Sequence, residues 1–435
     1  MRIETVYFRD FPPFADAQLT FPKVETPGKG ELHLLVGQNG TGKTRLLSLL
    51  AAALGNPNEL YFRSDEKVIN RSLIVAHFGF ELCVWSARLN AVEWTSKEFM
   101  QQIVTRFLTG QLLITNYGEN FLSKQNRPAY ADPCTALAFR GTSRVSDAPI
   151  VAMNAVVLGD PTDWLLFDHT ANTDLLIGQI MANIKIGAAM EMMSRNGNNP
   201  GRIMKIVTRL EAAITHVTGH KFYYVVEPNP KIAIKVFWDE VPMMLKQLPD
   251  GLRSIISWLV SSVAKIITIH AVHEDPLSLP LILLLDEPES HLHPAWQRKV
   301  LPAAQALFPQ AQMFVATHSP FVISSANDGW IHVLRANDAG VVKFEEPKPC
   351  SKGDTWIDAV EDILGITEWY DPETEALLIQ FRELKVAALS DTPDGVQKYR
   401  ELAATIATRS DSLSDLMGRE LRQFERQLGQ KRASA

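Results

Sequence analysis

The segment VGQNGTGKTRLL, from Val36 to Leu47, is the strongest indication of how this chain folds. Gly37 and Gly42, followed by Lys43 and Thr44, fill the pattern G-x-x-x-x-G-K-[ST]. The apolar run LHLLV before it is typical of a buried strand, and the residues after it have the apolar spacing of a helix. A glycine-rich loop between a strand and a helix is the arrangement of a phosphate-binding loop.

This loop predicts a nucleotide pocket. Glycines let backbone N–H groups turn inward as an anion nest, and the helix N-terminus adds a favourable dipole. Lys43 would place a positive charge between the β- and γ-phosphates, and the Thr44 hydroxyl is a hard oxygen ligand suited to Mg²⁺. The expected nucleotide-binding residues are Gly37, Gln38, Asn39, Gly40, Thr41, Gly42, Lys43 and Thr44.

A second stretch, LILLLDEPESHLHP, ends an aliphatic run with carboxylates. An acidic residue directly after a hydrophobic strand lies at the carboxyl edge of a sheet, where the ligands of open α/β folds collect. We expect Asp286 to hold Mg²⁺ or its water, and Glu287 to accept a proton from the attacking water. The alternative is an exposed acidic turn that caps the next helix, and it suits Glu289 better than the pair that ends the strand.

A third stretch, VATHSP, delivers a polar residue at the end of another apolar run. His318 could hydrogen-bond the γ-phosphate or the lytic water, and so report whether phosphate is present. A lone histidine is usually a satisfied loop or core residue, but its position one helix and one strand after Asp286 favours the site. The predicted catalytic residues are therefore Glu287 and His318, and the predicted metal ligands are Thr44 and Asp286.

The composition indicates a globular, cytoplasmic protein. The 435 residues are 46% hydrophobic, which suffices for a large core in two or three lobes. The net charge of -6 argues against a constitutive basic surface for nucleic acid, and three scattered cysteines favour a reducing compartment. The N-terminal residues lack an apolar signal region, and no apolar run approaches the ~20 residues of a membrane span.

The three motifs, GQNGTGKT, LLLDEPE and ATHSP, resemble in this order the Walker A, Walker B and switch-histidine motifs of an ABC-type ATPase head. The variant DEPESHLHP, followed by a helix and then THSP, is similar to the RecF, Rad50 and OLD branch rather than to transporter subunits. The region DPETEALLIQFRELK also resembles the helical tail of free-standing bacterial ATPases of anti-phage systems, such as the Septu and retron-associated ones. The resemblance implies ATP and Mg²⁺ as cofactors.

The expected fold class is α/β: a P-loop NTPase with an ABC-type head, a mixed sheet with antiparallel N-terminal strands, a helical lobe and a helical C-terminal extension. In the extension, Asp371 is a plausible N-cap before Pro372, and the apolar stripes are typical of a packed helical bundle. The expected domains are an N-terminal ATPase lobe with Walker A, the helical lobe, a C-terminal ATPase lobe and the extension, at residues 1–170, 171–220, 221–348 and 349–435.

The family implies a head-to-tail dimer with two sandwiched ATP molecules, each touched by a signature loop of the other subunit. The candidate here is LPDGLRSIIS, in which Gly251 and the start of a helix could present N–H groups to a γ-phosphate in trans. Pro249 replaces the signature serine, which puts the trans contact and the hydrolysis rate in question. We expect Asp250 to cap the helix and Arg253 to lie near the dimer seam.

Two further sets of residues have a functional and a structural interpretation. Arg140 and Arg144 lie where a Q-loop is expected and could touch phosphate or a partner, although solvated arginines are the more frequent case. His291 and His293 could form a pair of metal ligands. Because no further ligands accompany them in the sequence, we interpret them as dimer-seam or loop residues.

The sequence thus predicts an ATP-hydrolysing molecular switch that dimerises head to tail and regulates a separate effector, a nuclease or a toxin, in anti-phage defence. Long coiled-coil arms, a C-x-x-C hook and a membrane domain are absent, which disfavours Rad50-type and transporter functions. The alternatives are a RecF-like DNA-binding clamp and a slowly hydrolysing, ATP-locked scaffold. Nucleic acid is possible as a partner but is not indicated by the charge.

Overall fold

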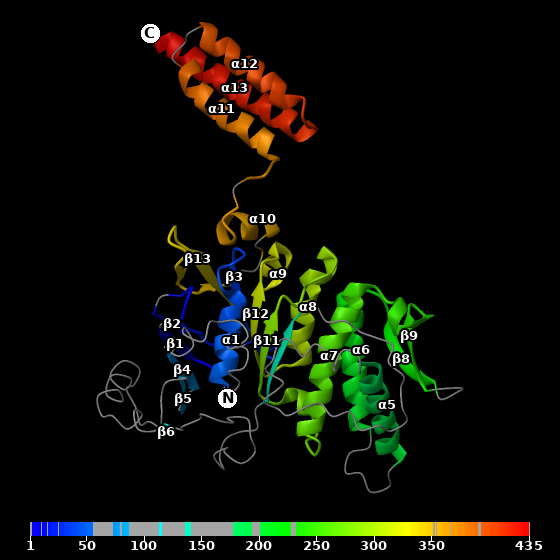
Figure 1. The fold of residues 1–435 in the computed structure, drawn as a ribbon. Coiled ribbons are helices and arrows are strands. Elements are labelled where there is room, and N and C mark those ends of the chain that lie inside the picture. Colours follow the sequence, from blue (N-terminus) through cyan, green and yellow to red (C-terminus); the bar gives the residue numbers. More distant parts are fainter. Residues whose placement is uncertain are drawn as a thin grey trace. The chain divides into compact units, whose positions relative to one another are not determined.

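The computed structural model describes residues 2–54, 73–78, 81–86, 113–114, 135–140, 177–193, 201–227, 232–350, 353 and 355–434, apart from a few positions within these ranges. The chain forms two compact units, Met1–Leu364 and Gly365–Ala435 (Figure 1). The fold is α/β with a P-loop and a mixed sheet, as the sequence predicts.

The N-terminal strands form a sheet of their own, in the order β2-β1-β4-β5-β6. Its strands are β1 (Thr5–Arg9), β2 (Ala17–Thr20), β4 (Leu73–Phe78), β5 (Glu81–Ser86) and β6 (Leu113–Ile114). The first four pair antiparallel, and β6 is parallel to β5. The predicted antiparallel pairing at the N-terminus is confirmed.

The main sheet has the order β14-β13-β3-β12-β11-β7, with β15 paired to β13. Its strands are β3 (Glu31–Gly37), β7 (Thr135–Arg140), β11 (Leu281–Asp286), β12 (Ala311–Thr317), β13 (Trp330–Ala336), β14 (Val342–Phe344) and β15 (Lys348–Pro349). The five strands from β13 to β7 are parallel, and β14 is antiparallel to β13. The carboxyl ends of β3, β12, β11 and β7 therefore meet at one edge.

Strand β11 shows how the two faces of this sheet are buried. Alternate residues of a strand point to opposite faces. Leu281, Leu283 and Leu285 enter the core that the sheet shares with α5, α6, α7 and α8, whereas Ile282 and Leu284 pack in the core with α1. These helices are α1 (Lys43–Ala53), α5 (Ile177–Met193), α6 (Arg202–Thr218), α7 (Asp250–Ile269) and α8 (Pro294–Leu307). The all-aliphatic sequence of β11 follows from burial on both faces.

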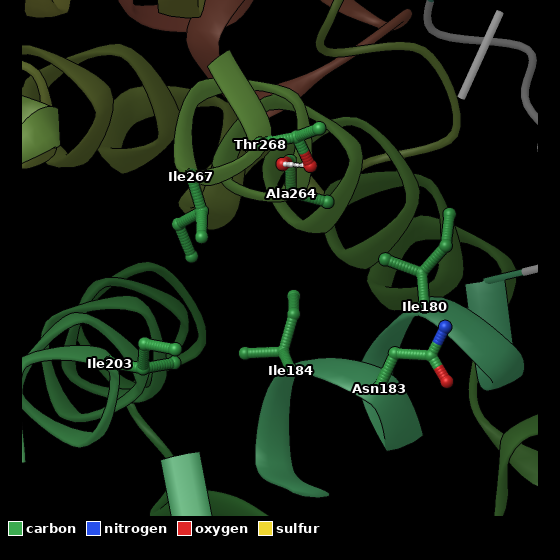
Figure 2. Close-up of a pocket in the computed structure, with 7 residues that line it drawn as sticks. All are labelled: Ile180, Asn183, Ile184, Ile203, Ala264, Ile267 and Thr268. Atoms are coloured by element: carbon green, nitrogen blue, oxygen red, sulfur yellow. Dashed lines mark hydrogen bonds between the residues drawn. The ribbon is translucent and has the colours of Figure 1, made fainter. Parts of the chain in front are cut away.

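A smaller antiparallel sheet lies beside α5 and α6 (Figure 1). It consists of β8 (Phe222–Glu227), β9 (Ala233–Trp238) and β10 (Val241–Met244). Between α5, α6 and α7, aliphatic side chains line a hollow of 170 Å³ (Figure 2). Its lining residues are Ile180, Asn183, Ile184, Ile203, Ala264, Ile267 and Thr268.

Helix α7 is a core helix of the first unit. Within the described part of the chain, it is the one helix long and apolar enough to cross a membrane. Most of its residues are buried, and it packs against β7, α5 and α6. Its apolar composition therefore serves the interior of the protein.

Two further α-helices among the described residues of the first unit are short. They are α9 (Pro320–Ser325), which follows β12, and α10 (Trp356–Asp358), which continues into a π-helical turn at Ala359–Ile363. The ring of Trp356 lies 5.9 Å from that of Phe321, so α10 is held against α9.

The second unit is a bundle of α11 (Pro372–Ala388), α12 (Pro393–Ala407) and α13 (Asp411–Ser434). Each helix gives an aromatic ring to its centre: the Tyr399 ring stacks on Phe381 at 4.4 Å and lies 4.5 Å from Phe424. Asp371 accepts hydrogen bonds from the backbone N–H groups of Glu373 and Thr374, both at 3.1 Å. The predicted N-cap and the predicted helical bundle are confirmed.

Candidate nucleotide site

The phosphate-binding loop joins β3 to α1 at the carboxyl edge of the main sheet. Gly40 and Gly42 have φ angles of 84° and 85°, a conformation that glycine adopts without steric cost. A Cβ atom on Gly42 would lie 2.8 Å from Cζ of Phe14, so only glycine fits against this ring. The loop thus turns sharply and presents the N-terminus of α1 to the pocket.

Lys43 folds back over the loop. Its ammonium group donates hydrogen bonds to the carbonyl oxygens of Gly37 and Gln38, at 2.8 and 3.0 Å. Burial lowers the pKa of Lys43, and the nearby carboxylates of Glu287 and Asp286 act in the opposite direction. The ammonium group is therefore held inside the loop. When a nucleotide binds, phosphate oxygens can replace the two carbonyl oxygens as its hydrogen-bond acceptors.

Thr44 and Asp286 face each other across the loop. The Thr44 hydroxyl lies 2.9 Å from Oδ1 and 3.1 Å from Oδ2 of Asp286. Neighbouring ligands of an octahedral Mg²⁺, each about 2.1 Å from the ion, lie about 3 Å apart. A hydroxyl and a carboxylate are also hard oxygen donors, so the two residues fit adjacent positions around this ion.

Arg140 is the third member of this group. It ends β7 directly beside Asp286 in the parallel register, and its Nε atom lies 3.2 Å from Oδ2 of that carboxylate. Burial raises the pKa of Asp286, while the Thr44 hydroxyl and the Arg140 guanidinium lower it. The arginine thus compensates a buried carboxylate, so the interpretation of Arg140 as solvated is wrong. Arg144 lies outside the described residues.

Glu287 stands in a left-handed backbone conformation, with φ of 49°. Its amide donates to the carbonyl of Ala316 at 2.9 Å, and its Oε1 lies 3.1 Å from Nδ1 of His318. The Ser290 hydroxyl is 3.5 Å from its other carboxylate oxygen. The structure thus brings the two predicted catalytic residues together at the ends of β11 and β12, next to the loop.

Glu289 does not lie where the sequence predicted, at an exposed turn that caps the next helix. It is 4% exposed, and its carboxyl accepts a hydrogen bond from the hydroxyl of Thr317. The N-cap of α8 is His293, whose Nδ1 accepts from the amide of Ala295 at 3.2 Å. The interpretation of Glu289 as an exposed helix cap is therefore wrong, because the turn after β11 directs this side chain inward toward β12.

The signature segment begins α7 in the structure. Pro249 is the N-cap and supplies no side-chain hydrogen bond, whereas Asp250 lies in the first turn and pairs with Arg253. The prediction that Asp250 caps the helix is therefore wrong: its carboxylate binds a guanidinium instead of backbone N–H groups. Gly251 packs so closely that an added Cβ would lie 2.7 Å from the carbonyl oxygen of His291. Within the described residues, Asp250, Gly251 and Arg253 are not among those that line the nucleotide pocket.

The pocket itself has a volume of 610 Å³. Its lining residues are Pro13, Asn39, Gly40, Gly42, Lys43, Thr44, Arg45 and Glu287. Pro13 and Arg45 were not expected from the sequence. Arg45 donates to the carbonyl of Pro12 at 2.6 Å and lies over the ring of Phe11, which attaches the turn before β2 to the loop. The sequence signal for Pro13 is FPPF, a turn-rich segment between two strands, whereas Arg45 directly follows the loop motif.

His291 and His293 belong to the turn before α8. His291 has φ of 66°, and His293 is the cap of the helix. No group of three or more histidine, cysteine, aspartate or glutamate side chains suited to a metal ion occurs in the part of the chain that the structure describes. This agrees with the interpretation of both residues as loop residues.

Two family models match the motif-bearing segments of the chain. One, described as "AAA domain, putative AbiEii toxin, Type IV TA system", matches residues 247–324, and one described as "AAA domain" matches residues 1–55. The first covers the signature segment, β11, β12 and His318, and the second covers the phosphate-binding loop.

Several curated proteins are similar to part of this chain. "Retron Ec83 probable ATPase" of Escherichia coli is 29% identical over 110 residues, which are 25% of this chain and 20% of that protein. "Septu protein PtuA" of Bacillus thuringiensis is 29% identical over 105 residues, 23% of this chain and 26% of that protein. The chain thus spans about a fifth to a quarter of the length of these relatives.

Among solved structures, the Smc head bound to the C-winged helix domain of ScpA aligns with 80% of this chain and 98% of that chain. The TM-score is 0.42 at 13% identity. The family models and the relatives confirm the resemblance that the motifs predicted, to ABC-type ATPases such as the retron and Septu proteins.

Proposed function

We propose that this chain is a Mg²⁺-dependent ATPase that works as a molecular switch. The observation that carries the proposal is the convergence of Thr44, Asp286, Glu287 and His318 at the ends of neighbouring strands, beside the phosphate-binding loop. The names of the relatives, one of them a probable ATPase, support this chemistry.

The protein groups divide the work of phosphoryl transfer. Backbone N–H groups of the loop and the Lys43 ammonium bind the phosphates, and Thr44 and Asp286 hold the ion. Bound Mg²⁺ supplies positive charge that offsets the negative charge of the transferring phosphoryl group. Glu287 accepts the proton of the attacking water. His318, whose Nδ1 lies 3.1 Å from Oε1 of Glu287, orients that carboxylate and contacts the γ-phosphate.

The switch requires a second copy of the chain. In our proposal two heads close around two ATP molecules, and the N-terminus of α7 in one subunit faces the nucleotide of the other, with Asp250, Gly251 and Arg253 at the seam. Hydrolysis then removes the shared γ-phosphate contact and opens the dimer. This cycle gives a partner two states to distinguish.

The partner is a separate effector, a nuclease or a toxin, and the setting is defence against phage in the cytoplasm. The Septu and retron names of the relatives and the toxin system named by the family model support this assignment. The net charge of -6 gives no support for nucleic acid as the first partner.

The test is phosphate release together with solution mass, for wild type and Glu287→Gln, each with and without Mg²⁺-ATP. We expect wild type to turn over, and the variant to be inactive and trapped as a larger assembly. Equal phosphate release by both proteins would show that Glu287 is not the base. No change of mass with ATP would remove the dimer cycle.

The same measurements identify the second candidate, an ATP-locked scaffold. Pro249 favours it, since the N-cap of α7 offers neither a hydroxyl nor an N–H group to a phosphate in trans. A scaffold would dimerise with ATP while releasing almost no phosphate. Salt-dependent DNA affinity that requires ATP would instead indicate a RecF-like clamp.

A further inference from the structure

Two loops of the nucleotide site are joined by a buried hydrogen bond. Glu289 lies two residues after Glu287, and Thr317 directly precedes His318. The Thr317 hydroxyl donates to Oε1 of Glu289, and both side chains are inaccessible to solvent or nearly so. The same hydroxyl accepts the amide N–H of Ser319 at 3.0 Å.

The turn that carries Glu287 is therefore fixed to β12 at two points. One is the backbone hydrogen bond from Glu287 to Ala316, and the other is the side-chain bond from Glu289 to Thr317. Glu287 has a left-handed backbone, which is disfavoured for a residue with a side chain, so contacts that hold the turn oppose its relaxation. Within the turn, the amide of Ser290 also donates to the carbonyl of Glu287 at 3.0 Å.

The loop that carries His318 is held at Thr317 by the hydrogen bond to Glu289, and at Ser319 by further hydrogen bonds. The Ser319 hydroxyl donates to Oε1 of Gln297 on α8 at 2.6 Å and accepts the amide of Val322 at 3.3 Å. Thr317 thus stands between a loop anchored on α8 and α9 and a turn anchored on β12. The bond from Thr317 to Glu289 therefore links the segment that carries His318 to the segment that carries Glu287.

We propose that Glu289 is a positioning residue for ATP hydrolysis, which acts through Thr317 to hold Glu287 against His318. The inference rests on the proposed function, since it assigns a role within that reaction. Glu289 itself does not line the nucleotide pocket among the described residues, so it does not act on the nucleotide directly.

The state of the Glu289 carboxyl agrees with this role. Burial raises its pKa to about 7. Its second oxygen, Oε2, is buried without a hydrogen-bond partner within the described residues, which is costly for an ionised carboxylate. A neutral carboxyl adds no third negative charge beside Asp286 and Glu287 and still accepts the Thr317 hydroxyl. The amide of a glutamine can accept the same bond.

Four variants test the connection. Thr317→Val and Glu289→Met remove one partner each at similar size, and Thr317→Ser and Glu289→Gln keep a donor and an acceptor. Thr208→Val is the matched control, because the Thr208 hydroxyl donates to the Met204 carbonyl at 3.0 Å on the exposed side of α6. For each, kcat and KM for ATP, the ATP dissociation constant and the unfolding temperature are measured.

We expect Thr317→Val and Glu289→Met to lower kcat about 10-fold to 100-fold, the effect of a misplacement of about 1 Å. KM and the dissociation constant should change less than about threefold, since nucleotide binding is left intact. The double variant should lose no more than the worse single variant, and Thr317→Ser and Glu289→Gln should stay within about threefold of wild type.

Wild-type kcat in Thr317→Val, or losses that add up in the double variant, would overturn the proposal while leaving ATP hydrolysis in place. A loss in Glu289→Gln as large as in Glu289→Met would also overturn it. If Glu289→Met does not fold, Thr317→Val against Thr317→Ser decides alone. Absence of hydrolysis in wild type, by contrast, refutes the proposed function itself.

Discussion

Arg140 and Asp286 form an ion pair across the ends of two adjacent parallel strands, with Nε and Oδ2 3.2 Å apart. The carboxylate is largely buried, and the arginine is the positively charged group that offsets its charge. Removing one partner of such a pair leaves an uncompensated charge, at a cost that depends on burial.

Arg140→Gln should therefore destabilise the protein by about 1–2 kcal/mol in the presence of EDTA, a value reduced for the partial exposure of Arg140. Mg²⁺ should restore more stability in the variant than in wild type, because the ion takes over the neutralisation of Asp286. Thermal unfolding in EDTA, Mg²⁺ and Mg²⁺-ATP measures both effects. Equal responses of the two proteins to Mg²⁺ would mean that ion and arginine do not share this carboxylate.

Lys43→Met should abolish nucleotide binding without unfolding the protein. The long apolar side chain can keep the packing of the lysine stem, while the charge that faces the phosphates is lost. We expect at least a 100-fold weaker ATP affinity, or about 2.7 kcal/mol, by titration calorimetry. Lys29→Met, which breaks the pair between Lys29 and Asp328 elsewhere in the first unit, is the matched control and should bind normally.

Glu289→Gln should make the protein more stable at neutral and alkaline pH. The pKa of Glu289 is about 7 when folded, against an ordinary value of 4.5. Between these values the unfolded chain loses the proton that the folded protein keeps, so the free energy of unfolding of wild type falls as pH rises. Above pH 7 the deficit reaches about 3 kcal/mol, and glutamine avoids it.

Urea unfolding at pH 5, 6 and 8 measures this difference. The gap between Glu289→Gln and wild type should grow across the series and then level off. Glu346→Gln, at an exposed position of the first unit, is the control and should show no such growth. A gap that does not change with pH would show that Glu289 is already ionised at pH 5.

Gly251→Ala should destabilise the first unit by about 1–3 kcal/mol, the usual cost of forcing a methyl group into a packed site. Its Cβ would lie 2.7 Å from the carbonyl oxygen of His291 and 3.1 Å from a methyl group of Leu292. Gly418→Ala in α13 is the matched control, since its nearest neighbour atom is 3.5 Å away. We expect that change to be neutral or stabilising, because alanine favours helix.

The sequence was sufficient to predict those elements for which the residue motif, the apolar pattern and the turn residues all indicate the same structure. The glycine pattern, the apolar strand before it and the helical spacing after it all predicted the phosphate-binding loop, and Asp286, Glu287 and His318 were placed by the strands that precede them. Each of these predictions used only residues that are close together in the sequence, so one sequence was enough to make it.

The sequence did not predict the places of Arg140 and Glu289, because they depend on strand pairing and on backbone conformation. That Arg140 lies beside Asp286 follows from the pairing of β7 with β11, 146 residues apart, and no local pattern shows it. Glu289 turns inward because the left-handed Glu287 redirects the chain. Asp250 was a plausible cap by residue type, but Arg253 lies one helical turn away and pairs with its carboxylate instead, an i,i+3 pairing that the sequence prediction did not weigh.

The side chains of β11 alternate between two cores, and this restricts which insertions and deletions the strand tolerates. Deleting one residue inside the strand would exchange the side chains that face α1 with those that face α7, and would turn Asp286 away from Thr44. Loss of the core and loss of the site would occur together. Insertions and deletions in β11 are thus eliminated by misfolding before they can yield a folded protein with a misaligned site.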